Sequence, residues 1–150
     1  MKIALASDER TALTDAVLRD LQERGHEVET LLPEPGATLP WADVGAWVGR
    51  RVATGQADQG VLFCWTGTGV SMAANKVLGV RAALCGDPET ARGARRWNDA
   101  NVLVMSLRAT SEPVAHEILD AWFSTPASEE PEDRSNIAKL NQIAETVSIA

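Results

Sequence analysis

Short apolar runs alternate with helical patterns along most of the chain, and this alternation limits the possible folds more than any other feature. The runs lie at residues 3–6, 27–31, 60–63, 80–84 and 101–105. Between the first two, Leu13, Val17 and Leu21 recur at helical spacing, and Gly25 marks the stop. Strands that alternate with helices build βαβ units. We therefore predict an α/β fold with a parallel sheet.

Further helices are predicted downstream, at residues 45–52, 89–97 and 113–123, followed by a polar loop at 124–133 and a final helix. The helix at 89–97 carries Arg92, Arg95 and Arg96, and we expect Arg95 and Arg96 on a solvated face. The final helix has an apolar face formed by Ile137, Leu140, Ile143 and Val147. This face could pack against either of two partners, a neighbouring subunit or the sheet of its own chain.

Length and composition predict one domain spanning residues 1–150 and exclude several classes of protein. The formal charge of −7 argues against nucleic-acid and membrane partners. No apolar run approaches the roughly 20 residues of a membrane span, and the N-terminus does not resemble a signal peptide. The two cysteines and two histidines lack the spacing of a disulfide framework or a metal site. We expect a cytoplasmic protein without a metal.

A strand-to-helix turn at residues 64–76 concentrates a thiol, hydroxyls and glycines. Right-handed crossovers should bring Cys64 to the carboxyl edge of the sheet together with Asp8 and Asp87, where α/β sheets bind ligands. Helix N-terminal dipoles lower the pKa of a thiol from about 8.5, which suits a general base. The alternative for Cys64 is a small buried apolar side chain. Four residues of the turn offer amides for an oxyanion, worth on the order of 3 kcal/mol per donor: Gly67, Gly69, Val70 and Ser71.

Over residues 1–122 the chain resembles the ribose-5-phosphate isomerase B and LacAB family of sugar-phosphate isomerases. The resemblance is carried by residues 2–4 with Ser7 and Asp8, and by residues 64–76, 79–85, 90–92 and 98–103. It implies a Rossmann-like three-layer sandwich with a five-stranded parallel sheet and a C-terminal helix. It also implies an enzyme that needs no cofactor and acts on a small-molecule sugar. Its homodimers, or tetramers, share active sites between subunits.

The resemblance also implies roles for single residues. Cys64 is the general base that moves a proton between C1 and C2 of the sugar through an enediolate. Thr66 acts on the neighbouring oxygen of the sugar. Asp8 contacts sugar hydroxyls, although an N-cap of the first helix is an alternative. Asn98 and Arg108 reach the substrate from the second subunit, with Arg108 near the phosphate. The alternative for Arg108 is a solvated surface side chain.

Five departures from the family pattern concern the substrate. Glu9 and Trp97 replace histidines, Trp65 replaces a glycine, residues 39–43 replace an Asp-Tyr-Pro element, and an acidic tail leaves only Arg134 as a phosphate contact. Carboxylates repel a phosphate, whereas a carboxylate and an indole together suit a neutral sugar. The alternatives are that Trp65 and Trp97 fill core or interface space, and that the arginines of residues 92–96 supply positive charge.

Three functions are compatible with these residues. The first is a cofactor-independent aldose–ketose isomerase with a substrate other than ribose 5-phosphate, such as an unphosphorylated or short-chain sugar. The second is a non-catalytic sugar-binding or metabolite-binding paralogue on the same scaffold. The third, a nucleotide-binding module, is weak because the Gly-x-Gly element follows the third strand and no acidic residue is placed for a ribose.

Overall fold

The computed structural model describes the backbone of residues 1–147 and the side chains of residues 1–143. The predicted contribution of Val147 to an apolar face therefore lies outside the described side chains. The strands are β1 (Lys2–Ser7), β2 (Glu27–Leu31), β3 (Gln59–Cys64), β4 (Ala82–Leu84) and β5 (Val102–Ser106). The helices are α1 (Ala12–Glu23), α2 (Trp41–Ala53), α3 (Thr68–Asn75), α4 (Pro88–Asn98), α5 (Glu112–Ser124) and α6 (Pro131–Val147).

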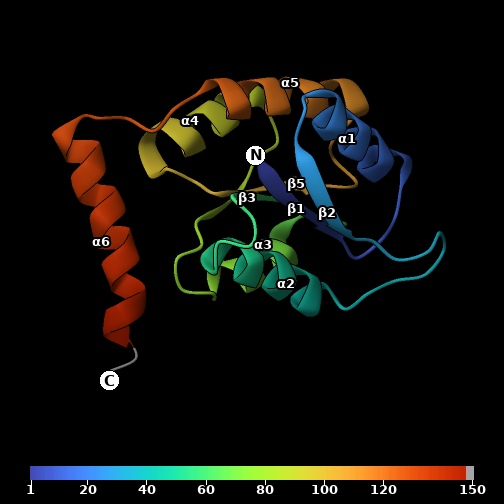
Figure 1. Ribbon diagram of the computed structural model, residues 1–150, viewed down its shortest axis with the longest axis horizontal. Helices are drawn as coiled ribbons and strands as arrows, with labels where there is room; N and C mark the ends of the chain where they lie inside the picture. The colour runs from blue at the N-terminus through green and yellow to red at the C-terminus, as the bar shows by residue number, and fades with distance from the viewer. Residues whose placement is uncertain (148–150) are drawn as a thin grey trace.

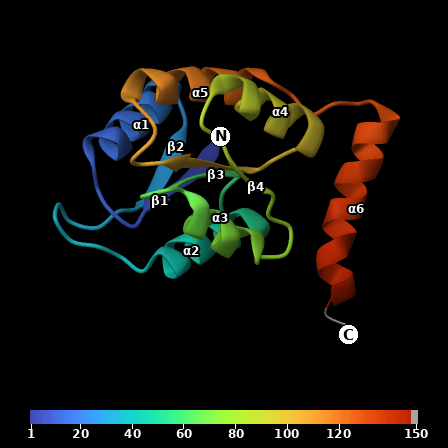
Figure 2. The same ribbon diagram turned by 180° about the vertical axis from the view of Figure 1, so that it is seen from behind.

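The five strands form one parallel sheet in the order β2-β1-β3-β5-β4. Helices α1, α4 and α5 lie on one side of the sheet, and α2 and α3 lie on the other (Figures 1 and 2). This arrangement confirms the predicted Rossmann-like three-layer sandwich.

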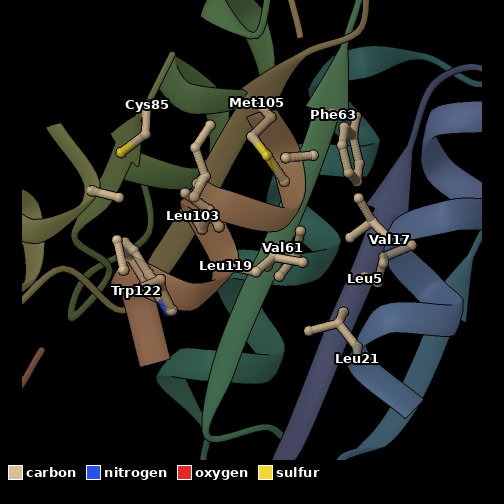
Figure 3. Packing of buried hydrophobic residues seen from close by; sticks show 14 of the residues in the cluster. Leu5, Val17, Leu21, Val61, Phe63, Cys85, Leu103, Met105, Leu119 and Trp122 are labelled. Atoms are coloured by element: carbon tan, nitrogen blue, oxygen red, sulfur yellow. The ribbon is translucent and has the colours of Figure 1, made fainter. Parts of the chain in front are cut away.

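Each face of the sheet carries its own apolar core, because alternate residues of a strand point to opposite faces. On the α1, α4 and α5 side, Leu5, Phe63 and Met105 are fully buried (Figure 3). The side chain of Trp122 is buried there too, and its indole N–H donates to Gln59 Oε1 at 2.8 Å. The opposite core, toward α2 and α3, consists mainly of small residues and contains Cys64.

Small residues let α2 lie close to its neighbours. A Cβ on Gly60 would lie 2.3 Å from Val48 Cγ1, and a Cβ on Gly45 would lie 2.7 Å from Ala73 Cβ. Helix α2 begins at Trp41, four residues before the predicted start at residue 45, and this added turn also packs closely: Val44 is fully buried and the Trp41 ring lies against Gly69 of α3. Glycine lowers helix propensity locally, but here close packing compensates for it.

The strand predicted at residues 80–84 is shorter in the structure and begins at Ala82. Val80 N–H donates to Val77 O at 3.1 Å, so this residue belongs to the turn after α3. The carbonyl of Arg81 accepts from the backbone N–H of Asn101 at 3.0 Å, just before the β4–β5 ladder. An apolar residue in a turn is indistinguishable from a strand residue by pattern alone.

Helix α6 projects away from the sheet (Figures 1 and 2). It packs mainly against α4 and leaves Leu140 46% and Ile143 59% exposed. Packing of this helix on its own sheet, one of the two predicted alternatives, is therefore wrong. Within the described part of the chain, none of the helices has the length and apolarity to span a bilayer.

Candidate active site

The carboxyl ends of β1, β3 and β5 meet at one edge of the sheet. Cys64 pairs with Ser106 of β5, and Ser7 pairs with Phe63, so Asp8 lies beside Cys64 in the continued register. The alternation of buried residues puts all three side chains on the α2 and α3 face. Asp87 lies farther away than predicted, because β5 stands between β3 and β4. Asp87 is instead the N-cap of α4, accepting from Thr90 N–H at 2.8 Å.

Cys64 lies at the base of this edge, with its residue only 6% exposed. Its backbone carbonyl accepts from Leu107 N–H at 3.0 Å, which fixes the end of β3 against the turn after β5. The side chain of Cys64 belongs to the same buried cluster as Val70, in the first turn of α3. The burial of Cys64 is compatible with both predicted roles, a small apolar core residue and a general base. The groups around Cys64 therefore distinguish between these two roles.

The turn between β3 and α3 presents backbone amides next to Cys64. Gly67, the N-cap of α3, has φ +82°, a left-handed conformation that glycine adopts readily. The hydroxyls of Thr66 and Thr68 lie 2.8 Å apart across this turn. The first helical amides, including those of Gly69 and Val70, have no acceptor within the helix and suit an oxyanion.

Ser71 does not offer such an amide. Its N–H donates to Gly67 O at 3.3 Å, so the prediction that its amide is free is wrong. The reason is helix geometry: the fourth amide after the N-cap is the first to reach an acceptor within the helix. The amides available for an oxyanion are therefore concentrated nearer Gly67.

Asp8 has a carboxylate oxygen, Oδ1, that is shielded from solvent and has no hydrogen-bond partner among the described residues. Burial raises the pKa of this carboxyl, and the negative charge of Glu9 raises it further. The alternative role as a helix cap is wrong, because Thr11 caps α1. An unpartnered buried oxygen is costly, so this one is suited to accept from a ligand hydroxyl.

The segment that precedes α2 is joined to this edge. Leu39 N–H donates to Asp8 O at 2.9 Å, and Glu9 pairs with Thr38 in an antiparallel bridge. At the start of α2, Trp41 lies so close to Gly69 that a Cβ there would be 2.8 Å from its ring. The structure therefore adds Trp41 to the site. Sequence reasoning missed it because nothing local indicates which helix its ring contacts.

Trp65 and Arg108 lie at the same edge. Trp65 is 57% exposed, and its carbonyl accepts from Arg108 N–H at 3.0 Å and from Ser106 Oγ at 2.9 Å. Ser106 was not predicted as a site residue, although its position at the end of an apolar run signals a strand end. The exposed side chain of Arg108 leaves both predicted roles open, a solvated surface side chain and a phosphate contact from the second subunit.

The remaining predicted site residues, Trp97, Asn98 and Arg134, lie elsewhere in the same chain. Helix α4 follows β4 and returns to the start of β5, so its C-terminal residues Trp97 and Asn98 lie at the amino edge of the sheet, opposite Cys64. Trp97 is 55% exposed, so neither tryptophan, 65 or 97, fills the core of this chain. Asn98 lines a cavity of about 590 Å³ between α6 and β4, and Arg134 lines a second cavity of about 410 Å³.

One predicted surface residue is also corrected. Arg95 is mostly buried beside Asp99, whereas Arg96 is exposed as predicted. Within the residues described, no three His, Cys, Asp or Glu side chains group closely enough to hold a metal ion.

A family model described as Ribose/Galactose Isomerase matches residues 3–140. Ribose-5-phosphate isomerase B of Escherichia coli is 38% identical over 111 residues, covering 65% of this chain and 73% of that protein. D-Erythrulose-4-phosphate isomerase of Pectobacterium atrosepticum is 33% identical over 125 residues, covering 82% of each. The structure of Clostridium thermocellum ribose-5-phosphate isomerase B aligns with a TM-score of 0.92 at 32% identity, covering 98% of this chain and 99% of that one. The chain thus belongs to the ribose/galactose isomerase family.

Proposed function

We propose that this protein is a cofactor-independent aldose–ketose isomerase that uses Cys64 as its general base. The observation that supports this best is the place of Cys64, between the end of β3 and the first amides of α3, beside Asp8. A base, amides that suit an oxyanion and an acceptor for a sugar hydroxyl thus share one edge of the sheet.

The reaction we propose moves one proton between adjacent carbons. The Cys64 thiolate takes the proton from C2 of an open-chain aldose, the C–H electron pair becomes the C1=C2 bond, and the carbonyl pair moves to O1. Amides at the start of α3 stabilise the charge on this enediolate. The Cys64 thiol then protonates C1, while Thr66 transfers the O2 proton to O1 and leaves the C2 carbonyl of the ketose.

The substrate we propose is a sugar or sugar phosphate other than ribose 5-phosphate. Glu9 and Trp97 stand where the resemblance implies histidines, which leaves no histidine to open a sugar ring at either position. A short-chain sugar, already open, avoids that step. The relative named D-erythrulose-4-phosphate isomerase acts on a four-carbon compound, which supports a short chain. Glu9 disfavours a phosphate nearby through charge repulsion.

We also propose a homodimer, or a tetramer built from dimers, in which two chains complete each site. Trp97, Asn98 and Arg134 lie away from Cys64 in one chain, so a second copy is needed to bring them to it. A twofold-symmetric contact between two chains would bring Cys64 of each chain together with Trp97, Asn98 and Arg134 of the other, and so form two complete sites. The exposed apolar side chains of Leu140 and Ile143 on α6 support such a contact.

Proton exchange tests the proposed reaction. Incubation with three- to six-carbon aldoses and ketoses, free and phosphorylated, in deuterated water should introduce deuterium at the carbon next to the carbonyl. Cys64→Ala should abolish this exchange, because it removes the group proposed to take the proton. Cys85→Ala is the matched control, since this second thiol lies in the opposite core.

Absence of exchange across the whole panel would contradict the isomerase proposal. Sugar binding that is unaffected by Cys64→Ala, without turnover, would instead support the non-catalytic paralogue. The phosphate question has its own measurement: inorganic phosphate should inhibit less than the free sugar. Tight phosphate binding that depends on Arg108 and Arg134 would contradict the neutral-sugar preference.

A further inference from the structure

The turn that ends α4 has an unusual backbone conformation. Asp99, the C-cap of this helix, has φ +46° and ψ +44°, and it is the one residue other than glycine with positive φ among those described. A left-handed conformation disfavours residues that carry a Cβ, so surrounding contacts must hold it. Asp99 directly follows Trp97 and Asn98, the α4 residues proposed to enter a partner's active site.

Arg81 supplies most of these contacts. Its Nε donates to Asp99 O at 2.8 Å, and its Nη2 donates to Asp99 Oδ2 at 3.4 Å. Its Nη1 donates to Asn141 Oδ1 of α6 at 3.3 Å. The side chain is only 16% exposed. One guanidinium therefore holds the end of α4 and also contacts α6.

Two further groups complete this arrangement. Arg95 Nη1 donates to Asp99 Oδ1 at 3.2 Å and to Ala100 O at 2.5 Å, from within α4 itself. Asn101 Oδ1 accepts from Arg81 N–H at 2.8 Å, which fixes the backbone that carries the guanidinium. The Asp99 carboxylate thus lies between two arginines, and each arginine also donates to a backbone carbonyl of the turn.

We propose that Arg81 is a positioning residue that holds Asn98 and Trp97 in the orientation required by the active site of the neighbouring subunit. This inference rests on the proposed shared site, in which Asn98 contacts the substrate. The planar guanidinium makes several directed hydrogen bonds at once, which a flexible ammonium group does not reproduce. Because α6 is held by the same side chain, the orientations of α4 and α6 are linked.

Kinetics of Arg81 variants test the proposal. Arg81→Ala should lower kcat/KM by about 10²-fold, mostly through kcat, because a displacement near 1 Å in a reacting group has an effect of that size. Arg81→Lys keeps the charge but loses the directed hydrogen bonds. Its kcat/KM should therefore exceed that of Arg81→Ala by less than tenfold. Arg51→Ala is the control: this arginine pairs with Glu29 of β2, away from α4 and α6, and activity should be unchanged.

Two substitutions at Asp99 separate backbone conformation from charge. Asp99→Gly and Asp99→Ala both remove the carboxylate, but only glycine adopts a positive φ without strain. Asp99→Gly should retain at least tenfold more activity than Asp99→Ala. Equal activity of the two variants would show that the left-handed turn does not matter for catalysis.

Coupling to Asn98 distinguishes positioning from a general loss of structure. If Arg81 acts through Asn98, Arg81→Ala should lower kcat/KM less than threefold in an Asn98→Ala background. Multiplicative effects of the two substitutions, or full activity of Arg81→Lys, would overturn the proposal.

Amide exchange gives a readout that needs no catalysis. The Asp99 N–H donates to Arg95 O and the Ala100 N–H donates to Ala94 O, at 3.2 and 3.0 Å. Arg81→Ala should speed exchange of both amides at least tenfold while leaving the amides of β3 unchanged. Unchanged exchange at these two positions would overturn the proposal even if the wild-type protein shows no isomerase activity.

Discussion

Two cysteines in one chain occupy chemically different surroundings. Burial raises the pKa of the Cys85 thiol to about 12, with a smaller contribution from Asp87, and Cys85 is 0% exposed in the core. Cys64 lies at the carboxyl edge, next to the start of α3. Reactivity of a cysteine depends on its thiolate fraction and its accessibility, so the difference between the two is measurable.

We predict that iodoacetamide at pH 8 modifies Cys64 and spares Cys85 in the folded protein, because the Cys85 thiol is both protonated and inaccessible. Intact mass and peptide mapping should show one adduct, on the peptide that contains Cys64. Cys64→Ala should prevent labelling until the protein is unfolded. An adduct on Cys85 of the folded chain would contradict this prediction.

Gly67 is a second residue whose identity the structure explains. Gly67→Ala should lower the free energy of unfolding by about 1–2 kcal/mol, because a residue with a Cβ is strained at φ +82°. The added Cβ would also lie 2.5 Å from Leu84 Cδ1. Urea denaturation measures this loss.

The control for Gly67 is Gly86→Ala, where the added Cβ meets no atom within 4 Å and φ is not positive. Stability should stay unchanged or rise by about 0.4–1 kcal/mol, through loss of unfolded-state entropy. A loss at Gly86 equal to that at Gly67 would argue against the role of backbone conformation.

At the scale of elements, α1 and α5 are joined by a charged network on the protein surface. Arg24 of the α1 C-terminus donates to Asp20 and to Asp120 at 2.6 Å each. His116 Nδ1 lies 2.7 Å from Asp20 Oδ2, and its Nε2 lies 3.4 Å from Asp120 Oδ2. The hydrogen bond and charge of Asp20, followed by the charge of Asp120, raise the pKa of His116.

We predict that His116 makes the α1–α5 contact pH-dependent. A histidine whose pKa is raised by folding stabilises the fold below its unfolded pKa of about 6.5, and the effect is lost as pH rises through the folded value. His116→Gln should therefore lower Tm more at pH 6 than at pH 9. Thermal unfolding followed by circular dichroism measures both differences.

His26 should show the opposite pH dependence and serves as the control. Burial lowers its pKa, with smaller contributions from the N-terminal amino group and Arg24. Its protonation on acidification therefore opposes folding. The Tm of His26→Gln relative to the wild type should therefore rise as the pH falls below 6.5. Equal pH profiles for the two variants would contradict both assignments.

The boundaries of these elements show what local patterns predict. Residues 27–31 were predicted as a strand with the bounds that the structure has, because the flanking turn and loop are marked by glycine and proline. The start of α2 lies four residues before the predicted one, since its first turn packs through Trp41 against Gly69 of α3, a contact that no local pattern records.

At the scale of the whole molecule, the predicted site residues form two groups at opposite edges of one chain. We predict that Leu140→Asp keeps the proposed dimer from forming, because it puts a charge on the apolar face of α6. Sedimentation velocity measures the mass. Ser135→Asp, a comparable charge at an exposed position of the same helix, should leave the dimer intact.

A shared site predicts complementation between inactive variants. Cys64→Ala and Asn98→Ala disable different parts of each site, so a mixed dimer contains one site with both residues intact. Co-expression of the two variants should restore about a quarter of wild-type activity, since about half of the dimers are mixed and each has one working site. No recovery in confirmed mixed dimers would contradict the shared arrangement.

The sequence by itself determined the parallel α/β architecture and the placement of Cys64 at a strand-to-helix turn, because periodicity and glycine positions are local properties. Tertiary structure alone decided that the Trp41 ring lies against Gly69, since α2 and α3 are distinct helices that meet only through packing. It also decided that Asn98 lies opposite Cys64, because strand order and the direction of α4 follow from contacts between distant segments. Those contacts depend on shape and packing, which no spacing of residues along the chain encodes.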